Sequence, residues 1–149
     1  MKLRHLTTSA LALILMAACT DATGVGVEPD DLVGKWTSTS LIFTSVADPS
    51  VSMDLVAEEG AQVILVLGAD GAYTFTFTSD VEATENETGT YTVSGNIMTV
   101  TPVTPEGLEP EDILIARVGD TLTLTLDDEV VFAQGANAEA AVLVAVLTR

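Results

Sequence analysis

Threonine alternates with apolar residues in several stretches of this chain, and this alternation constrains the fold more than any other feature. In residues 72–78 threonine alternates with tyrosine and phenylalanine, and in residues 121–126 it alternates with leucine. Residues 90–93 repeat the pattern. A period of two places successive side chains on opposite faces of a strand, and Thr, Val, Tyr and Phe all favour strands. The sequence therefore predicts β-strands with one apolar face and one hydrated face.

Three other stretches, residues 62–67, 113–118 and 141–147, are apolar almost throughout. Such a run is typical of a strand that is covered on both faces. Residues 51–57 are consistent with a strand, a helical turn or a lid, and residues 130–132 with a further short strand. We expect eight principal strands, at residues 33–46, 61–68, 72–80, 89–94, 97–103, 112–118, 121–127 and 138–148.

Tight-turn residues separate several of these strands. Gly71, Gly95 and Gly119 each lie beside Asp or Asn between two strand-like stretches, and these residue types tolerate the positive φ of short hairpin turns. Seven or eight antiparallel strands joined in this way favour a small up-and-down β-barrel, because closing the sheet removes its exposed edges. A β-sandwich is the alternative.

The N-terminal region has the features of a bacterial lipoprotein signal. Two basic residues within the first four positions precede an apolar segment at residues 10–16, which is too short to span a bilayer. Ala17 and Ala18 come directly before Cys19, the one cysteine of the chain. This arrangement resembles the lipobox, in which the cysteine is the residue that carries the lipid.

The resemblance to lipoproteins implies removal of residues 1–18 and lipid attachment at Cys19. Residues 19–31 contain glycine and proline without apolar periodicity, so we expect a flexible tether, followed by one domain at residues 32–149. In better-known lipoproteins an aspartate after the cysteine retains the protein in the inner membrane. Thr20 occupies that position here, which favours attachment to the outer membrane of the cell envelope.

The charge that remains after removal of the signal excludes several functions. Only three basic side chains are left, Lys35, Arg117 and Arg149, against 22 acidic ones, and these cannot form the positive surface that nucleic-acid binding requires. The histidine is removed and the cysteine is expected to carry lipid, so nucleophiles activated by histidine and zinc sites built from Cys and His are excluded. We therefore expect a protein that is not an enzyme, with no catalytic residue, no metal and no cofactor other than the lipid.

Acidic residues cluster in three segments that we expect to be loops, at residues 80–89, 102–112 and 127–137. Carboxylates are good calcium ligands, but their spacing here does not match an EF-hand loop. We therefore favour a solvated acidic rim over a calcium site.

Short motifs within residues 32–149 resemble the lipocalin-like domains of bacterial lipoproteins. The Gly-x-Trp at residues 34–36 is similar to the motif that opens their first strand, and residues 70–74, 89–96 and 119–124 are similar to their later strands and turns. The resemblance implies a cup of about eight strands, which is wide enough either to fill itself with side chains or to hold one small apolar molecule.

The same resemblance identifies candidate residues in the cup. Those that would line a ligand cavity, or otherwise simply form the core, are Phe43, Tyr73, Phe75, Phe77 and Met98.

A barrel-closing pair is also implied, because lipocalin-like folds pack a basic side chain across the tryptophan at the barrel floor. Antiparallel closure places Arg149 beside Trp36, with Arg117 as the alternative partner.

These features lead to two hypotheses for function. The first is an envelope lipoprotein, attached to the membrane through its lipid, that binds a small apolar or amphipathic ligand in its barrel. The alternative is a non-enzymatic interaction or inhibitor module that uses the barrel rim and acidic loops against another protein.

Overall fold

The computed structural model describes residues 26–80, 83–103, 109–134 and 137–149, and the side chains among them except those of residues 127–139. The predicted signal peptide, Cys19 and the first part of the predicted tether lie outside the described residues. Within those ranges, no helix is long and apolar enough to cross a membrane.

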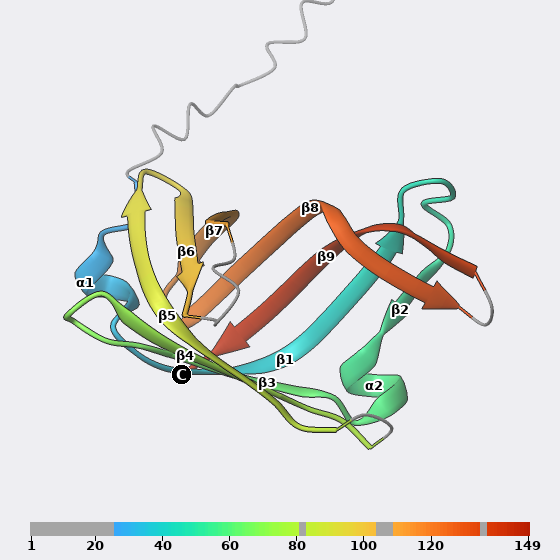
Figure 1. Cartoon of the computed structure of the whole chain (residues 1–149), viewed down its shortest axis with the longest axis horizontal. Coiled ribbons are helices and arrows are strands. Elements are labelled where there is room, and N and C mark those ends of the chain that lie inside the picture. The colour runs from blue at the N-terminus through green and yellow to red at the C-terminus, as the bar shows by residue number, and fades with distance from the viewer. Residues whose placement is uncertain (1–25, 81–82, 104–108, 135–136) are drawn as a thin grey trace, which may run out of the picture.

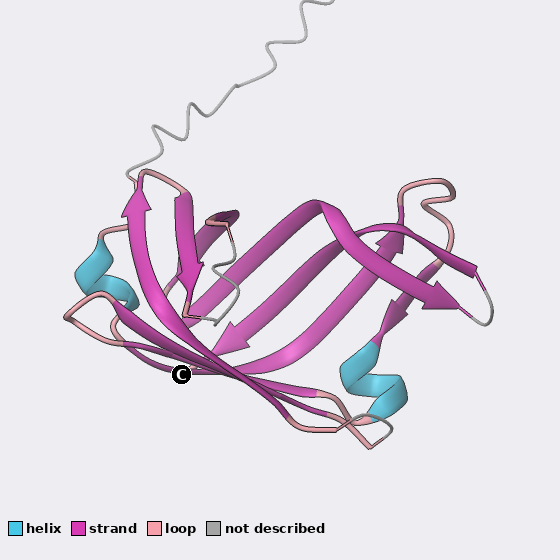
Figure 2. Ribbon diagram, viewed as in Figure 1, coloured by secondary structure: helices cyan, strands magenta, loops and turns pink. Residues whose placement is uncertain are grey.

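Eight antiparallel strands close into one barrel (Figure 1, Figure 2). Each strand pairs with the next, and β1 pairs with β9 from Thr37 opposite Thr148 to Ser45 opposite Ala141. The predicted up-and-down barrel is therefore confirmed, and the sandwich alternative is wrong. The barrel strands are β1 (Gly34–Ser45), β3 (Gln62–Leu67), β4 (Ala72–Thr78), β5 (Glu85–Ser94), β6 (Ile97–Pro102), β7 (Glu111–Val118), β8 (Thr121–Gln134) and β9 (Asn137–Thr148).

Two strands extend into segments that were expected to be acidic loops. β5 begins at Glu85 and not at residue 89, because Glu85 and Glu87 pair with Phe77 and Phe75 of β4. β8 continues to Gln134, which makes most of the expected loop at residues 127–137 part of a ladder with β9. An irregularity in register between Leu126 and Val130 accommodates the acidic residues. Pairing with a neighbouring strand thus overrides the low strand propensity of acidic residues.

Two of the three apolar runs, those in β3 and β7, are covered on one face only, contrary to the expectation from sequence. Buried and exposed positions alternate in β3 and β7, and Val66 and Leu114 are each 41% exposed on the outside of the barrel. At these strands the outer surface of the barrel faces solvent, so no other element packs against their outward apolar side chains.

One end of the barrel is closed by a tightly packed floor. Leu32, Trp36, Leu122 and Leu147 are fully buried there. Leu32 belongs to a short helix, α1 (Pro29–Leu32), and its carbonyl oxygen accepts a hydrogen bond of 2.7 Å from Nε1 of Trp36. The end of the predicted tether thus folds against the barrel.

The tight turns lie at this same closed end. The backbone N–H of Val27 donates to the carbonyl of Gly95 in the β5–β6 turn. Gly95 and Gly119 have positive φ, 64° and 59°, which explains why glycine occupies these two hairpin turns.

Two additional elements form part of the barrel wall where β1 separates from β3. Their pairing ends at Thr37 opposite Ile64, and farther along, β1 pairs with β2 (Ser52–Asp54). β2 leads into the short helix α2 (Leu55–Glu59). The ambiguous stretch at residues 51–57 therefore forms a strand and part of a helix, and together β2 and α2 fill the gap between β1 and β3 (Figure 1).

Candidate ligand-binding site

The barrel encloses a cavity of about 490 Å³ that is partly open to solvent. All eight barrel strands contribute side chains to it, and Met53 of β2, Leu55 of α2 and Glu59 of α2 complete the wall. This volume lies within the range of about 300–1,000 Å³ that is usual for small-molecule sites. The cavity exists because the long strands extend well beyond the packed floor.

All five candidate lining residues lie against this cavity. Tyr73 and Met98 are almost fully buried, and Phe43, Phe75 and Phe77 are half-buried. Tyr73 and Met98 also belong to the hydrophobic core, and Phe75 and Phe77 pack against it. Four of the five residues therefore contact both the core and the cavity, since the core of the barrel is also the wall of the cavity, and Phe43 contacts the cavity.

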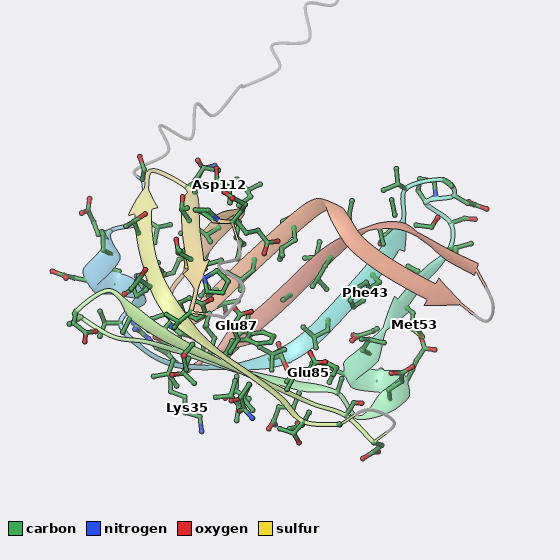
Figure 3. All side chains as sticks on the ribbon, in the orientation of Figure 1. Lys35, Phe43, Met53, Glu85, Glu87 and Asp112 are labelled. Carbon is green, nitrogen blue, oxygen red and sulfur yellow. The ribbon has the colours of Figure 1, made fainter. Side chains whose placement is uncertain are left out.

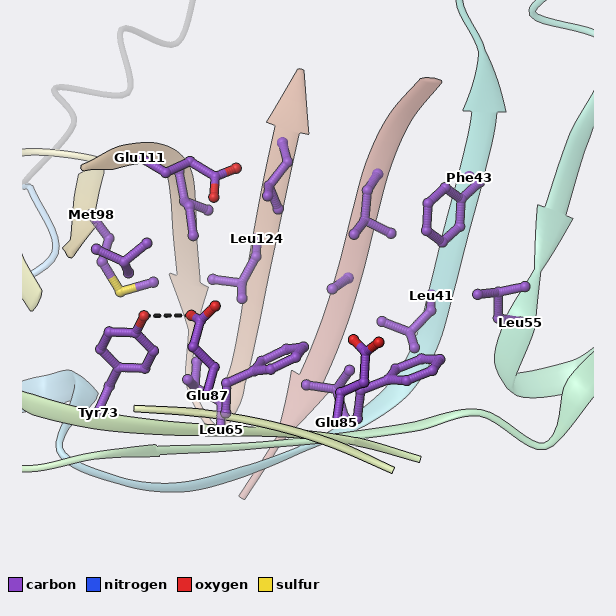
Figure 4. A pocket seen from close by; sticks show the side chains of 18 of the residues that line it. Leu41, Phe43, Leu55, Leu65, Tyr73, Glu85, Glu87, Met98, Glu111 and Leu124 are labelled. Atoms are coloured by element: carbon purple, nitrogen blue, oxygen red, sulfur yellow. Dashed lines mark hydrogen bonds between the residues drawn. The ribbon is translucent and has the colours of Figure 1, made fainter. Parts of the chain in front are cut away.

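Sequence reasoning missed four carboxylates in the lining: Glu59, Glu85, Glu87 and Glu111. The last three belong to segments expected to form a solvated rim. Glu85 is exposed, whereas Glu87 and Glu111 are half-buried in the lining of the cavity. In Figure 4 their carboxylates point into the cavity. The alternation of side chains along β5 could have predicted this orientation, because Glu85, Glu87 and Tyr91 are an even number of residues apart and therefore share the inward face.

The carboxylate of Glu87 is held by the hydroxyl of Tyr73. Tyr73 Oη donates to Glu87 Oε1 at 2.5 Å (Figure 4), which is typical of a hydrogen bond to a charged acceptor. Burial raises the pKa of Tyr73, and the hydrogen bond to Glu87 together with the charges of Glu87 and Glu111 raises it further. Tyr73 therefore remains protonated, as a donor, throughout the physiological pH range.

Gly89 makes room for this arrangement. It lies opposite Tyr73 in the β4–β5 ladder. A Cβ atom at Gly89 would lie 2.6 Å from Cε1 of Tyr73 and 2.2 Å from the carbonyl oxygen of Thr101. Only glycine permits so close an approach of the tyrosine ring and the neighbouring strand.

At the closed end, the structure brings Arg149 and Trp36 together. Cζ of Arg149 lies 4.8 Å from the centroid of the Trp36 ring, and Nε of Arg149 lies 3.2 Å from Oδ1 of Asp120. Arg117, the alternative partner, instead forms an ion pair with Asp31 at 3.3 Å.

A family model for the lipocalin-like domain matches residues 32–134, which is more than half of the chain. This chain belongs to the lipocalin-like domain family. No curated protein and no solved structure gives a significant match to it. The family is typically non-enzymatic, and its barrel suggests ligand binding in general terms.

The described part of this lipocalin-like barrel contains no group of three or more His, Cys, Asp or Glu side chains placed to hold a metal ion. Glu109 and Asp112 of the second acidic segment are exposed. Glu106, and the side chains of Asp127, Asp128 and Glu129, lie outside the described part.

Proposed function

We propose that this lipocalin-like domain binds a small apolar or amphipathic ligand in its cavity without catalysing a reaction, and that a lipid on Cys19 holds it in the bacterial outer membrane. The observation that carries the proposal is the cavity of about 490 Å³, lined mainly by apolar side chains and partly open to solvent. An open mouth and an apolar lining are the properties expected of a small-molecule site.

The phenylalanines of the cavity support a ligand over simple core packing. Phe43, Phe75 and Phe77 line the space but remain half-buried. Covering such surface is favourable by roughly 25 cal/mol per Å², so an apolar ligand gains affinity from surface that the protein leaves uncovered.

The position of the N-terminal segment fits a membrane-anchored receptor. α1 lies at the closed end of the barrel, where residue 27 contacts the β5–β6 turn. A tether from Cys19 would therefore reach the barrel at its floor. The mouth would face away from the membrane and stay accessible to a ligand in the surrounding compartment.

The alternative, a module that binds another protein through an acidic rim, gains less from the structure. Glu87 and Glu111 are half-buried in the lining of the cavity, so these two carboxylates are less accessible to a protein partner than residues of a fully solvated rim.

Filling the cavity tests ligand binding. Ala145 lines the cavity and is 4% exposed, so Ala145→Phe should occupy ligand space. With dodecanol as a neutral probe and isothermal titration calorimetry as the readout, we expect binding to the unaltered chain and at least tenfold weaker binding to the variant. Ala116→Phe is the matched control, because Ala116 is exposed on β7.

Thermal melts establish that both phenylalanine variants remain folded, and Ala145→Leu is the milder replacement if the first does not. Equal affinity of dodecanol for the unaltered chain and a folded cavity-filled variant would contradict the proposed site.

The membrane anchor is tested separately with Cys19→Ser in a bacterial host. Loss of the only cysteine should move the protein from the membrane pellet to the soluble fraction, since acyl chains contribute about 0.8 kcal/mol per buried CH₂ to attachment. Retention in the pellet after a high-salt wash would count against lipid anchoring at this residue.

A further inference from the structure

We propose that the ligand of this cavity is a cationic amphiphile, with its apolar chain in the barrel and a protonated amine or quaternary ammonium head beside Glu87 and Glu111. This inference rests on the proposed function and narrows it to one chemical class. It depends on where the charged side chains of the described residues lie, as follows.

Every charged side chain that the structure places in the cavity lining is acidic. Glu59, Glu85, Glu87 and Glu111 are present, and the described lining contains no lysine, arginine or histidine. The neighbouring lining residues on the strands are apolar, apart from the hydroxyl of Tyr73. The cavity thus combines an apolar interior with charges that are all negative.

The basic side chains of the described residues are all used elsewhere. Arg149 lies over Trp36 and pairs with Asp120, and Arg117 pairs with Asp31. Lys35 is exposed and points away from the barrel (Figure 3). None of the three belongs to the lining of the cavity, so none is placed to bind the head of an anionic ligand there.

Glu87 and Glu111 reach the same cavity from two different strands. Glu87 accepts the hydrogen bond from Tyr73, and the charges of both glutamates act on the Tyr73 hydroxyl. Glu87 lies opposite Phe75 in the β4–β5 ladder, and Glu111 lies opposite Val100 in the β6–β7 ladder. Two strands, β5 and β7, therefore each contribute a carboxylate to the cavity, and Figure 4 shows that of Glu87 at the hydroxyl of Tyr73.

Glu87 and Glu111 are half-buried beside apolar lining residues, and a carboxylate that loses part of its water is stabilised by hydrogen bonds or by a positive charge. The Tyr73 hydroxyl satisfies one oxygen of Glu87 and leaves the other available. An ammonium head supplies positive charge and, when protonated, N–H donors. A carboxylate or phosphate head would meet like charge, and a neutral alcohol would gain no ion pair.

Three probes with the same alkyl chain separate these cases: dodecylammonium, dodecanol and dodecanoate. They are titrated into the full chain at neutral pH, with dodecylammonium and dodecanoate below their micelle concentrations and dodecanol below its solubility limit. They should bind in the order ammonium, alcohol, carboxylate. We expect dodecylammonium to bind at least tenfold more tightly than dodecanol, with a difference that shrinks as salt is added.

Variants locate the charge that makes this difference. Glu87→Gln keeps an acceptor for Tyr73 but removes the charge, and Glu111→Gln is its counterpart on β7. Each should weaken dodecylammonium binding roughly tenfold and leave dodecanol binding within about twofold. Asp112→Asn is the matched control, because Asp112 follows Glu111 in β7 but is exposed and bonds Thr99. It should leave all three affinities unchanged.

The outcomes separate this inference from the function on which it rests. Tight binding of dodecanol or dodecanoate that matches or exceeds dodecylammonium would overturn the cationic ligand and leave the apolar site standing. Unchanged dodecylammonium affinity in both glutamine variants would overturn it in the same way. Failure of all three probes to bind the folded chain would overturn the proposed function itself.

Discussion

At the scale of single residues, Trp36 organises the closed end of the barrel. Its side chain is fully buried, its Nε1 donates to the carbonyl of Leu32, and the guanidinium of Arg149 covers its ring. Gly34 precedes it with φ of 138°, a conformation that L side chains rarely adopt. The Gly-x-Trp pattern thus joins a backbone requirement to a packing requirement.

Replacement of Trp36 by alanine should lower the free energy of unfolding by roughly 3–5 kcal/mol, because a large buried side chain is lost from the floor. A double-mutant cycle on Trp36→Leu and Arg149→Ala should give a coupling energy of about 0.5–1 kcal/mol, the usual value for a partly exposed cation–π pair. Chemical denaturation measures both. Lys35→Ala is the control, since Lys35 is exposed, and a coupling of Trp36 to Arg149 no larger than that to Lys35 would count against the contact.

At the scale of elements, the β2–α2 segment depends on one carboxylate. Oδ1 of Asp54 accepts hydrogen bonds of 3.0 Å from the backbone N–H groups of Leu41 and Val56, and Oδ2 accepts from Ser40 Oγ. Beside it, the N–H of Val63 donates to Ser38 Oγ. These side chains take the place of backbone pairing where β1 leaves β3, and so attach the wall segment that carries Met53 and Leu55 to the barrel.

Asp54→Ala should therefore loosen this wall, at a cost of about 1–2 kcal/mol. Desolvation raises the pKa of Asp54, but hydrogen bonds from Leu41, Ser40, Val56 and Ala57 outweigh it and lower the pKa below its usual 3.8. Because the folded pKa is the lower one, the stabilisation is complete above pH 3.8 and is lost as the pH falls below it.

Hydrogen exchange of the backbone amides in residues 52–59, measured by mass spectrometry, tests whether this wall segment is loosened. Exchange there should be faster in Asp54→Ala at neutral pH, and the advantage of the unaltered chain should disappear in acid. Asp48→Asn serves as the control in the same connection, because among the described residues the carboxylate of Asp48 accepts hydrogen bonds from Ser50 alone. Equal protection of residues 52–59 in Asp54→Ala and the unaltered chain would rule out this role for Asp54.

At the scale of the whole molecule, both tyrosines link barrel folding to alkaline pH. Burial raises the pKa of Tyr73 and of Tyr91 above their usual 10.0, and Tyr91 Oη donates to the carbonyl of Gly68. The unfolded chain therefore loses these protons first. The contribution of the two hydroxyls to stability is complete below pH 10 and declines as the pH rises above it.

An alkaline titration followed by tyrosinate absorbance and circular dichroism checks this behaviour. The two tyrosines are the only ones in the chain, so their absorbance should rise together with loss of the β-sheet signal. Tyr73→Phe should leave half of the absorbance change. Titration of both tyrosines with a midpoint at pH 10 in a barrel that remains folded would contradict the buried hydroxyls.

The lining of the cavity shows which site residues the local sequence pattern can predict. The alternation in residues 72–78 predicts Tyr73, Phe75 and Phe77 on one face, and they do line the cavity. The same alternation runs along β5 from Tyr91 to Glu87 and Glu85, but the charge of these glutamates led to the prediction that residues 80–89 form a loop. Leu55 and Glu59 were beyond local pattern altogether, because their place in the wall depends on the separation of β1 from β3.

The sequence by itself determined that the chain forms antiparallel strands of alternating faces, their number and most of their order, because periodicity and turn chemistry are local properties of the backbone. Only the tertiary structure decided that Glu87 and Glu111 face inward, that β2 and α2 complete the wall, and that Arg117 pairs with Asp31 while Arg149 covers Trp36. These features depend on strand register and barrel closure, which bring together residues far apart in the chain. They also depend on the backbone groups that become available for hydrogen bonds where β1 separates from β3.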